Sequence, residues 1–454
     1  MRVASQKVAD SEYRVVVGLG TTGLSCARFL LQRGLPFVVV DTRSEPPGLA
    51  AFRREMPDVE LYAGEYPQAI VSAAAELIVS PGVAMDAAIV VEAIDAGVDV
   101  VGDIDLFMRE ATAPVVGITG SNAKSTVTEL LGQMARDAQL NVGVGGNLGT
   151  PALELLAPER ELYVLELSSF QLERAHRLGL SVATVLNVSA DHLDRHGTLS
   201  RYRAAKHRIF SGCKRAVVNR DDALTIPLLG SDVAVVNWCM AEPEAEGFGL
   251  RQQASVEYLS RGRELLIPVS EMGLVGRHNV ANALAAMALG FCAGLPLDAM
   301  LATLRTFKGL HHRCELVAEI DGVRYVNDSK GTNVGATEAA LCGLGGESNV
   351  LLIAGGQGKG ADFTQLQQAT ARHCKCLILL GEDAPLLDQA LRSSAPVLMV
   401  SSLGEAVAAA AAQAAEGDVV LLSPACASFD MFTGYVERGN TFAAHVRALA
   451  RGQQ

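Results

Sequence analysis

Short apolar runs rich in valine, isoleucine and leucine recur along most of the chain, and stretches with helical periodicity separate them. The clearest runs lie at residues 15–17, 37–40, 77–79, 115–119, 162–165, 182–188, 216–219, 323–326, 350–354, 377–380, 397–400 and 419–422. Their hydrophobicity is continuous rather than alternating, which is typical of strands that are buried on both faces. The pattern therefore predicts an α/β protein with parallel sheets flanked by helices.

The length and two breaks in this pattern predict three domains. A chain of 454 residues is too long for one ordinary domain. One break lies near 102–114, where Ala-Thr-Ala-Pro precedes a new strand, and another lies near 307–313, after an alanine-rich helix that starts around Asn279. We expect domains at 1–103, 104–309 and 310–454, the first and third Rossmann-like and the central one like a P-loop ATPase. The alanine-rich segment 406–415 is expected to be a packed helix between two strands.

Charge and composition narrow the classes of partner. The net charge is −12 with no block of lysine or arginine, which disfavours binding to nucleic acid or to an anionic membrane. An anionic ligand must then be held by a few placed cations and backbone amides. The nine cysteines are scattered and are expected to be free thiols in a reducing cytosol. Neither a signal peptide nor a run near the ~20 apolar residues of a membrane span is visible, so we expect a soluble cytoplasmic protein.

A glycine-rich turn near the N-terminus has the spacing of a dinucleotide-binding loop. Gly18-Leu-Gly20-Thr-Thr-Gly23 follows one predicted strand and opens a helix, and Asp41 ends the next strand. The glycines let the backbone approach a diphosphate at a helix N-terminus, where Asp41 is placed to accept from a ribose hydroxyl. The spacing fits NAD, FAD, a UDP-sugar or a tight turn without ligand, and these alternatives stay open at this point.

A second loop, from Gly117 to Thr126, has the features of a phosphate-binding loop. It follows a strand and opens a helix, with Lys124 placed for the β- and γ-phosphates and a Ser/Thr hydroxyl placed for Mg²⁺. The usual glycine before the lysine is Ala123 here. If that position requires a positive φ, alanine costs strain there.

Two further side chains follow predicted strands near this loop. Glu166 ends the run at 162–165, and His192 comes shortly after the run at 182–188. A buried strand seldom ends on an unpaired carboxylate, so Glu166 is expected to serve the Mg²⁺ of MgATP rather than to cap a helix. A lone histidine is more often structural, but the shared sheet edge favours a second divalent ion at His192.

Nine motifs occur in an order that resembles the Mur ligase family. They are GSNAKST, ELSSFQLE, NVSADHLDRH, YRAAKHRIF, GRHNVANALAA, HHRCE, NDSKGTN, GGQGKGADF and SPACASFDMF. The resemblance extends from about Gly18 to Gly439. Within the family it is greatest to the ligases that add D-glutamate to UDP-N-acetylmuramoyl-L-alanine in peptidoglycan precursor synthesis. It implies ATP and two Mg²⁺ sites as cofactors, no NAD, and a monomer.

The resemblance assigns roles to individual positions. The catalytic residues would be Lys124, His192 and Lys206. ATP would be bound by Gly120, Ser121, Asn122, Ala123, Lys124, Ser125, Thr126, Asn279, Asn282, Arg313 and Asp328. Metal ligands would be Ser125, Glu166, His192 and, if it carries a carbamate, Lys206. The UDP-substrate would contact Gly20, Thr21, Thr22, Asp41, Thr42, Arg43, Ser80, Pro81, Gly82, Asn147 and Ser168. D-Glutamate would contact Lys330, Thr332, Lys359, Ser428 and Tyr435, and at the last position the family often has phenylalanine.

The implied reaction passes through an acyl phosphate. The carboxylate of the substrate attacks the γ-phosphate of ATP, and the amine of D-glutamate then displaces phosphate while His192 or water accepts a proton. Another Mur or folyl-polyglutamate ligase remains an alternative. So does an NAD-dependent oxidoreductase with an unrelated P-loop domain, although it leaves Lys330, Lys359 and the Glu166/His192 pair unexplained.

Overall fold

The N-terminal part of the chain is a five-stranded parallel sheet with helices on both faces. The computed structural model describes residues 12–147, 149–274 and 276–452. The strand order is β3-β2-β1-β4-β5. These strands are β1 (Arg14–Val17), β2 (Phe37–Asp41), β3 (Leu61–Ala63), β4 (Glu76–Val79) and β5 (Asp99–Val101). The helices α2 (Thr21–Gln32), α3 (Leu49–Glu55) and α6 (Asp103–Glu110) pack on one face, and α4 (Gln68–Ser72) and α5 (Ala88–Asp95) on the other.

The central part is built on a nine-stranded sheet of order β14-β13-β12-β11-β10-β9-β6-β8-β7. The parallel strands are β6 (Val115–Thr119), β7 (Val142–Gly146), β8 (Leu162–Glu166), β9 (Val182–Val185), β10 (Arg215–Asn219) and β11 (Ala234–Trp238). The antiparallel ribbon β12 (Phe248–Gln253), β13 (Val256–Arg261) and β14 (Glu264–Pro268) extends one edge. The apolar-run pattern did not predict this ribbon, because its strands are half exposed and carry polar residues.

Helices cover both faces of the central sheet. α7 (Lys124–Asp137), α11 (Arg277–Ala293) and α12 (Leu297–Thr306) share one core with the sheet. The opposite face holds α8 (Ser169–Leu172), α9 (Leu193–His196) and α10 (Leu199–His207). Short 3₁₀ helices occur at Ala152–Leu155, Arg208–Phe210, Ala223–Thr225, Val269–Glu271 and Phe363–Leu366.

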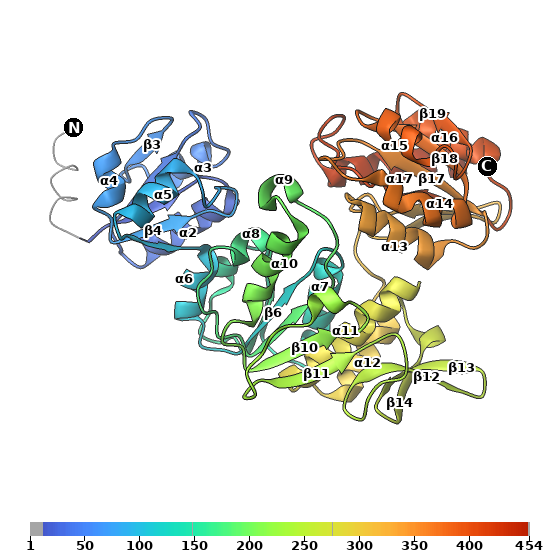
Figure 1. The fold of residues 1–454 in the computed structure, drawn as a ribbon, viewed down its shortest axis with the longest axis horizontal. Coiled ribbons are helices and arrows are strands. Elements are labelled where there is room, and N and C mark those ends of the chain that lie inside the picture. The colour runs from blue at the N-terminus through green and yellow to red at the C-terminus, as the bar shows by residue number, and fades with distance from the viewer. Residues whose placement is uncertain (1–11, 148, 275, 453–454) are drawn as a thin grey trace.

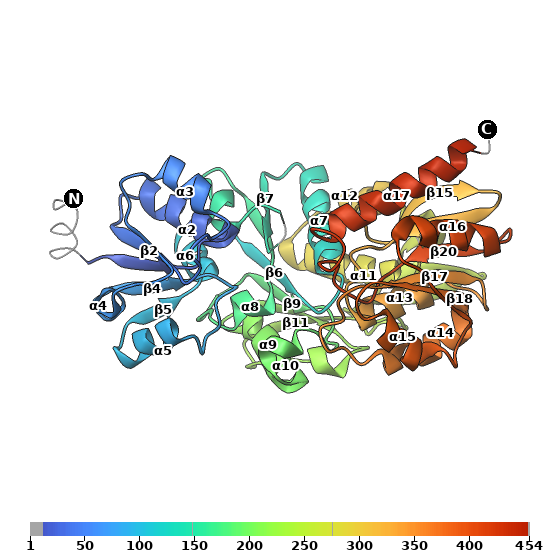
Figure 2. The same cartoon turned by 90° about the horizontal axis from the view of Figure 1, so that it is seen from above.

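The C-terminal part is a six-stranded sheet of order β15-β16-β20-β17-β18-β19. Its strands are β15 (Glu315–Ile320), β16 (Val323–Asn327), β17 (Val350–Gly355), β18 (Cys374–Leu380), β19 (Val397–Met399) and β20 (Val419–Leu422), and all pairs are parallel except β15 with β16. The helices α13 (Val334–Leu344), α14 (Gln367–His373) and α15 (Ala384–Leu391) cover one face, and α16 (Leu403–Gln413) and α17 (Tyr435–Gly452) the other (Figure 2). The predicted alanine-rich helix is therefore present as α16.

The three sheets lie in a row, with the nine-stranded sheet in the middle (Figure 1). This arrangement confirms the expected three-domain α/β fold, while the exact boundaries at 103 and 309 stay predictions. The carboxyl ends of β1 and β4, of β6 and β8, and of β16 and β20 are each followed by candidate site residues. Loops at the carboxyl ends of parallel strands are where open α/β sheets bind ligands. In the described ranges, no helix is long and apolar enough to cross a membrane.

Candidate active site

The phosphate-binding loop between β6 and α7 has a strained alanine at its end. Ala123 precedes the first residue of α7 and adopts φ +68° and ψ −9°, the left-handed region. An alanine in that region costs about 1–2 kcal/mol relative to the right-handed one. Ala123 thus adopts a backbone conformation that glycine would adopt more easily. The loop still presents the amides of the first turn of α7 at the end of the strand. Those amides are free for an anion.

A half-buried lysine and a buried one meet at one carbonyl oxygen of this loop. Lys124 Nζ donates to Gly120 O at 2.7 Å and to Ser121 O at 2.9 Å, and Lys206 Nζ donates to Gly120 O at 2.7 Å. Lys206 is 1% exposed, and its Nζ lies 4.4 Å from the centroid of the Tyr202 ring. Burial lowers the pKa of Lys206 well below its ordinary value, and the neighbouring Lys124 lowers it further. Lys206 is therefore held toward its neutral amine form.

Glu166 lies at the centre of a hydrogen-bond chain on the other side of the loop. Its Oε2 accepts from Ser125 Oγ at 2.7 Å, and its Oε1 accepts from Asn147 Nδ2 at 2.7 Å. Arg313 Nη2, from the C-terminal part, donates to the same Ser125 Oγ at 2.6 Å. Glu166 is buried, yet none of the salt bridges among the described residues includes it. A buried carboxylate beside a hydroxyl, with neutral partners only, suits a divalent cation.

His192 faces the same region from the turn before α9. It has φ +51°, and its Nε2 lies 3.7 Å from Asp191 Oδ2. Burial lowers the pKa of His192, although the carboxylate of Asp191 acts in the opposite direction. The ring is thus neutral near pH 7, the form that can bind a metal or accept a proton. Among the described residues, no group of three or more His, Cys, Asp or Glu side chains is arranged as a ready metal site.

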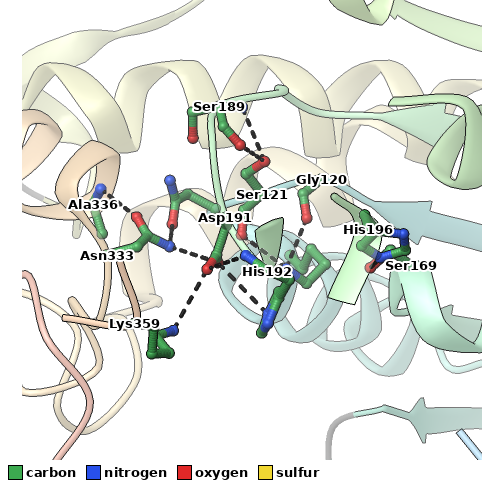
Figure 3. A network of polar contacts seen from close by, with 12 residues as sticks. Gly120, Ser121, Ser169, Ser189, Asp191, His192, His196, Asn333, Ala336 and Lys359 are labelled. Carbon is green, nitrogen blue, oxygen red and sulfur yellow. Dashed lines mark hydrogen bonds and ion pairs between the residues drawn. The ribbon is translucent and has the colours of Figure 1, made fainter. Parts of the chain in front are cut away.

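A polar network ties the C-terminal part to this loop, as Figure 3 shows. Asn333 Nδ2 donates to Asn122 Oδ1 at 3.2 Å and to Asp191 Oδ2 at 3.0 Å. Lys359 Nζ lies 3.5 Å from Asp191 Oδ1 and adds an ion pair between the C-terminal and central parts. The sequence reasoning missed the roles of Asn333 and Asp191. The only signal for Asn333 is its place before α13, where its Oδ1 accepts from Ala336 N as a helix cap at 2.9 Å.

A cavity of about 220 Å³ lies between the central and C-terminal parts. Its walls include several predicted ATP contacts, namely Asn122, Ala123, Thr126, Asn279, Asn282, Arg313 and Asp328. Asn282 Nδ2 donates to Asn279 Oδ1 at 3.1 Å, so the two side chains share one face of α11. Trp238 and His278 also line the cavity, and the sequence reasoning did not single them out. The cavity joins the phosphate-binding loop to α11, as a nucleotide site requires.

A buried carboxyl group and a half-buried lysine from the C-terminal part line the same cavity. Burial raises the pKa of Asp328 to about 6, while the hydrogen bond from Ser423 Oγ at 2.7 Å acts to lower it. Burial lowers the pKa of Lys330 to about 8, with Arg313 acting in the same direction. The Nζ of Lys330 lies 3.8 Å from the ring centroid of Tyr435. Tyr435 thus contacts the predicted site through its ring, an interaction that phenylalanine would also provide.

A smaller cavity of about 130 Å³ contains part of the predicted D-glutamate set. Thr332 and Lys359 line it together with Asp191 and His192. Ser428 lines neither of these two cavities; it is 2% exposed, and its main-chain oxygen accepts from Phe432 N at 2.8 Å. The structure therefore places Lys330, Thr332 and Lys359 on these cavities and the Tyr435 ring against Lys330, but it places the Ser428 side chain on neither cavity.

The first glycine-rich loop borders a separate cavity of about 650 Å³ in the N-terminal part. The residues around it include most of the predicted UDP contacts: Gly20, Thr21, Thr22, Asp41, Thr42, Arg43, Ser80, Pro81 and Gly82. Asn147 and Ser168 lie elsewhere, since Asn147 bonds Glu166 and Ser168 caps α8. A Cβ at Gly23 would come within 1.8 Å of Gly18 O, so the close approach of loop and helix requires glycine there.

The Asp41 carboxylate in this cavity is already bonded to four donors. Its Oδ2 accepts from Leu19 N at 2.7 Å and Arg43 Nη2 at 2.6 Å, and its Oδ1 accepts from Arg43 N and Nε, both at 2.9 Å. Burial acts to raise the pKa of Asp41, but the hydrogen bonds from Arg43 and Leu19, together with the charge of Arg43, lower that pKa. A carboxylate has about four lone-pair sites. Asp41 thus orients Arg43. A dinucleotide-binding fold would instead require its oxygens to accept from a ribose hydroxyl.

Comparison with known proteins gives a consistent result over the whole chain. Residues 12–102 match the model for the Mur ligase MurD-like N-terminal domain, 118–290 the Mur ligase middle domain, and 312–426 the Mur ligase glutamate ligase domain. The chain is 53% identical over 445 residues to UDP-N-acetylmuramoylalanine--D-glutamate ligase of Pseudomonas aeruginosa, covering 98% of this chain and 99% of that one. It is 51% identical over 436 residues to the ligase of the same name from Hahella chejuensis, covering 96% and 98%.

Solved structures with the same fold are more distant in sequence. The UDP-N-acetylmuramate-alanine ligase of Thermotoga maritima aligns with a TM-score of 0.59 at 19% identity, covering 96% of this chain and 99% of that one. The MurF ligase of Thermotoga maritima, solved in complex with ADP, aligns with a TM-score of 0.59 at 16% identity, covering 96% and 95%. With three domain models in order and relatives above 50% identity over almost all residues, this chain belongs to the Mur ligase family.

Proposed function

We propose that the protein is an ATP-dependent ligase that joins D-glutamate to UDP-N-acetylmuramoyl-L-alanine and so serves peptidoglycan precursor synthesis. The observation that carries the proposal is the meeting of Lys124, Glu166 and Arg313 at one loop between two domains. The names of relatives at 51–53% identity support the choice of substrates. An oxidoreductase role has no comparable support, because the acidic residue that would hold a ribose is bonded to Arg43 instead.

ATP would lie across the cavity between the central and C-terminal domains. Its phosphates would replace Gly120 O and Ser121 O as partners of Lys124, and its base would lie toward Asn279 and Asn282 on α11. Arg313 is placed to bind the negatively charged phosphates, because it already donates to Ser125 at the start of α7. Two cations close to the transferring phosphoryl group stabilise the negative charge that builds up on it in the transition state.

The residues present also fit magnesium. Ser125 and Glu166 would hold one ion, and His192 would hold a second with Lys206, if a carbamate gives that lysine a carboxylate-like end. The low pKa of Lys206 supports this, because only a neutral amine reacts with CO₂. Bound there, Mg²⁺ would supply positive charge that offsets the phosphoryl oxygens.

The UDP part of the substrate would occupy the N-terminal cavity, with Arg43 and the loop amides near its diphosphate. D-Glutamate would lie where Lys330, Thr332 and Lys359 approach the central domain. Its carboxylates need cations in an otherwise acidic chain, and Lys359 would exchange its contact with Asp191 for one of them. The Tyr435 ring would hold the ammonium group of Lys330 in position through a cation–π contact.

The reaction would then run in two steps on this chain. Lys124 holds the γ-phosphate while the L-alanyl carboxylate attacks it, which gives an acyl phosphate and ADP. The neutral amine of D-glutamate attacks the acyl carbon, and phosphate leaves. His192, neutral near pH 7, is placed to accept the amine proton unless it is bound to metal. We expect a cytoplasmic monomer without nucleic-acid partners, as the resemblance and the net charge of −12 imply.

A Lys124→Met variant tests the site directly. We expect ATP- and substrate-dependent phosphate release to fall by about 100-fold or more, because the methionine has no charge for the phosphoryl group. Arg136, exposed near the end of the same helix α7, provides the control variant Arg136→Met, which should keep wild-type release. Full activity of Lys124→Met would contradict the proposed phosphate site.

A further inference from the structure

Arg174 is a fully buried cation that the proposed reaction does not use. It lies in the turn after α8, in the central part of the chain, and its side chain is 0% exposed. It crosses to the N-terminal part and donates to the main-chain oxygens of Val79 at 3.0 Å, Val83 at 2.9 Å and Pro81 at 3.4 Å, and also to Ser80 O. One guanidinium thus gathers four carbonyl groups from five consecutive residues.

The position of Arg174 follows from the end of the sheet. β5 pairs with β4 from Asp99 opposite Glu76 to Val101 opposite Ile78, and the pairing stops there. The next carbonyl of β4, at Val79, therefore has no strand partner on that side, and Arg174 takes its place. The stem of Arg174 lies against Gly102, where a Cβ would come within 3.0 Å of Arg174 Cγ. Ser80 O also accepts from Val83 N at 3.0 Å and Val83 O from Arg195 Nη2 at 2.8 Å, so removing the guanidinium would affect the carbonyls of Val79 and Pro81 most.

Fixing these carbonyls also fixes the direction of the intervening amides. In a trans peptide the N–H points opposite to the preceding C=O, and the described chain has no cis bond. Val79 illustrates this, since its oxygen accepts from Arg174 while the next amide, Ser80 N, donates to Val17 O at 2.9 Å. By the same geometry, the Gly82 and Ala84 amides point away from Arg174. Both residues line the N-terminal cavity.

We propose that Arg174 is a positioning residue for the UDP-substrate: by holding the carbonyls of residues 79–83, it turns the amides of Gly82 and Ala84 toward the cavity as donors for an anionic diphosphate. This inference rests on the proposed function, because it takes the N-terminal cavity as the UDP site. It also connects the two substrates. Arg174 lies eight residues after Glu166. The segment that carries Glu166, near the proposed ATP site, therefore also holds residues 79–83, which would contact the diphosphate.

The test is titration of the full chain with UDP and, separately, with ADP and Mg²⁺, by calorimetry. We expect Arg174→Met to weaken UDP binding about tenfold or more, Arg174→Lys to weaken it less, and both to change ADP affinity by less than about twofold. The KM for the UDP-substrate should rise in the same ratio, with the KM for ATP nearly constant. Arg203→Met is the control, because the half-buried Arg203 donates to two main-chain oxygens of the central part, those of Leu224 and Ile226, away from the turn that carries Arg174.

Two results would overturn the inference: unchanged UDP affinity in a folded Arg174→Met, or an equal loss of UDP and ADP affinity, which would indicate general structural damage. Hydrogen exchange of the wild type gives a second test that needs no variant. UDP should slow exchange in the peptide containing Gly82 and Ala84, and unchanged exchange there would contradict the amide geometry. If wild-type protein binds no UDP at all, the UDP-site assignment fails and the inference fails with it.

Discussion

At the scale of single residues, Ala123 shows how a substitution that looks unfavourable is tolerated. Its φ of +68° is a conformation in which Gly is favoured. We expect Ala123→Gly to stay active and to change the free energy of unfolding by less than about 1 kcal/mol. The relief of about 1–2 kcal/mol of strain is offset by about 0.4–1 kcal/mol from the greater freedom of glycine in the unfolded chain.

A β-branched side chain at the same position gives the contrast. Ala123→Val should lower the free energy of unfolding by about 2 kcal/mol or more and weaken ADP binding, because valine tolerates a positive φ poorly. Denaturant unfolding and ADP titration of the three proteins measure this. A valine variant as stable and as tight-binding as the wild type would show that the loop relaxes to a negative φ at little cost.

Lys330 gives a pH dependence whose sign follows from its burial. Its pKa is lowered to about 8 from an ordinary value of 10.5. Between these pH values the unfolded chain binds a proton that the folded chain does not, so the contribution of Lys330 to stability rises with pH. We expect the free energy of unfolding of wild type, minus that of Lys330→Met, to increase from pH 8 toward 10.5 and to be flat from pH 6 to 7.

The difference between the two proteins removes most of the contribution of other titrating groups, including Lys124 and Lys206. Denaturant unfolding at a series of pH values between 6 and 10 provides the measurement. A difference that stays flat above pH 8, or falls, would mean that Lys330 is not desolvated in the folded protein. Its position against the Tyr435 ring would then need revision.

At the scale of elements, Asn333 has two functions that one substitution separates. Its Oδ1 caps α13, and its Nδ2 bonds Asn122 and Asp191 across the domain interface. Asn333→Ser keeps a good cap but loses both amide bonds. We expect kcat/KM for ATP to fall about tenfold, since one lost bond went to a charged acceptor, with a change in unfolding free energy below about 1 kcal/mol.

Steady-state kinetics and thermal unfolding of Asn333→Ser give both quantities. The control is Ser402→Asn on α16, a helix cap far from the interface, which should leave both unchanged because its Oγ serves only as a cap. Wild-type kcat/KM in Asn333→Ser would mean that the interdomain bonds of Asn333 do not support the active arrangement.

The elements themselves differ in how far the sequence predicts them. Strands buried on both faces, such as β6 and β17, appear as continuous apolar runs and were predicted to within a residue or two. The edge strand β7 reads VGVGG, and the β12–β14 ribbon mixes polar and apolar residues, so neither has a clear run. Half-exposed strands depend on their neighbours for stability more than on their own composition.

The candidate site follows the same rule. The nearness of Lys124, Glu166 and His192 to one sheet edge could be predicted, because Glu166 ends a strand that the sequence reveals and the other two lie in loops after such strands, while their roles stay predictions. Asn333 and Arg174 were not, since their partners lie up to 211 and 95 residues away and no local pattern reports such contacts. Asn147 was expected near the UDP-substrate, whereas its amide donates to Glu166. A loop with several polar residues shows that a site exists without showing which side chain faces which ligand.

At the scale of the whole molecule, function depends on the placement of the three domains. The nucleotide cavity needs Arg313, Asp328 and Lys330 from the C-terminal part as well as the loop and α11 of the central part. The cavity proposed for UDP lies in the N-terminal part, which is joined to the central part through Arg174 and through the bond from Gln171 Nε2 to Asp103 Oδ2 at 2.9 Å. Under the proposed function, the UDP-substrate would lie in the N-terminal part and ATP between the other two parts, so that the reacting groups would meet over the central sheet.

The measurement that tests this account most directly is phosphate release with MgATP and UDP-N-acetylmuramoyl-L-alanine, offering D-glutamate, L-glutamate and other amino acids in turn. The account predicts rapid release with D-glutamate, formation of the amide product, and little release with the others or without the UDP-substrate. Equal release with a different amino acid would retain the ligase chemistry and contradict the proposed specificity. No release with any amino acid, from folded protein, would contradict the proposed reaction itself.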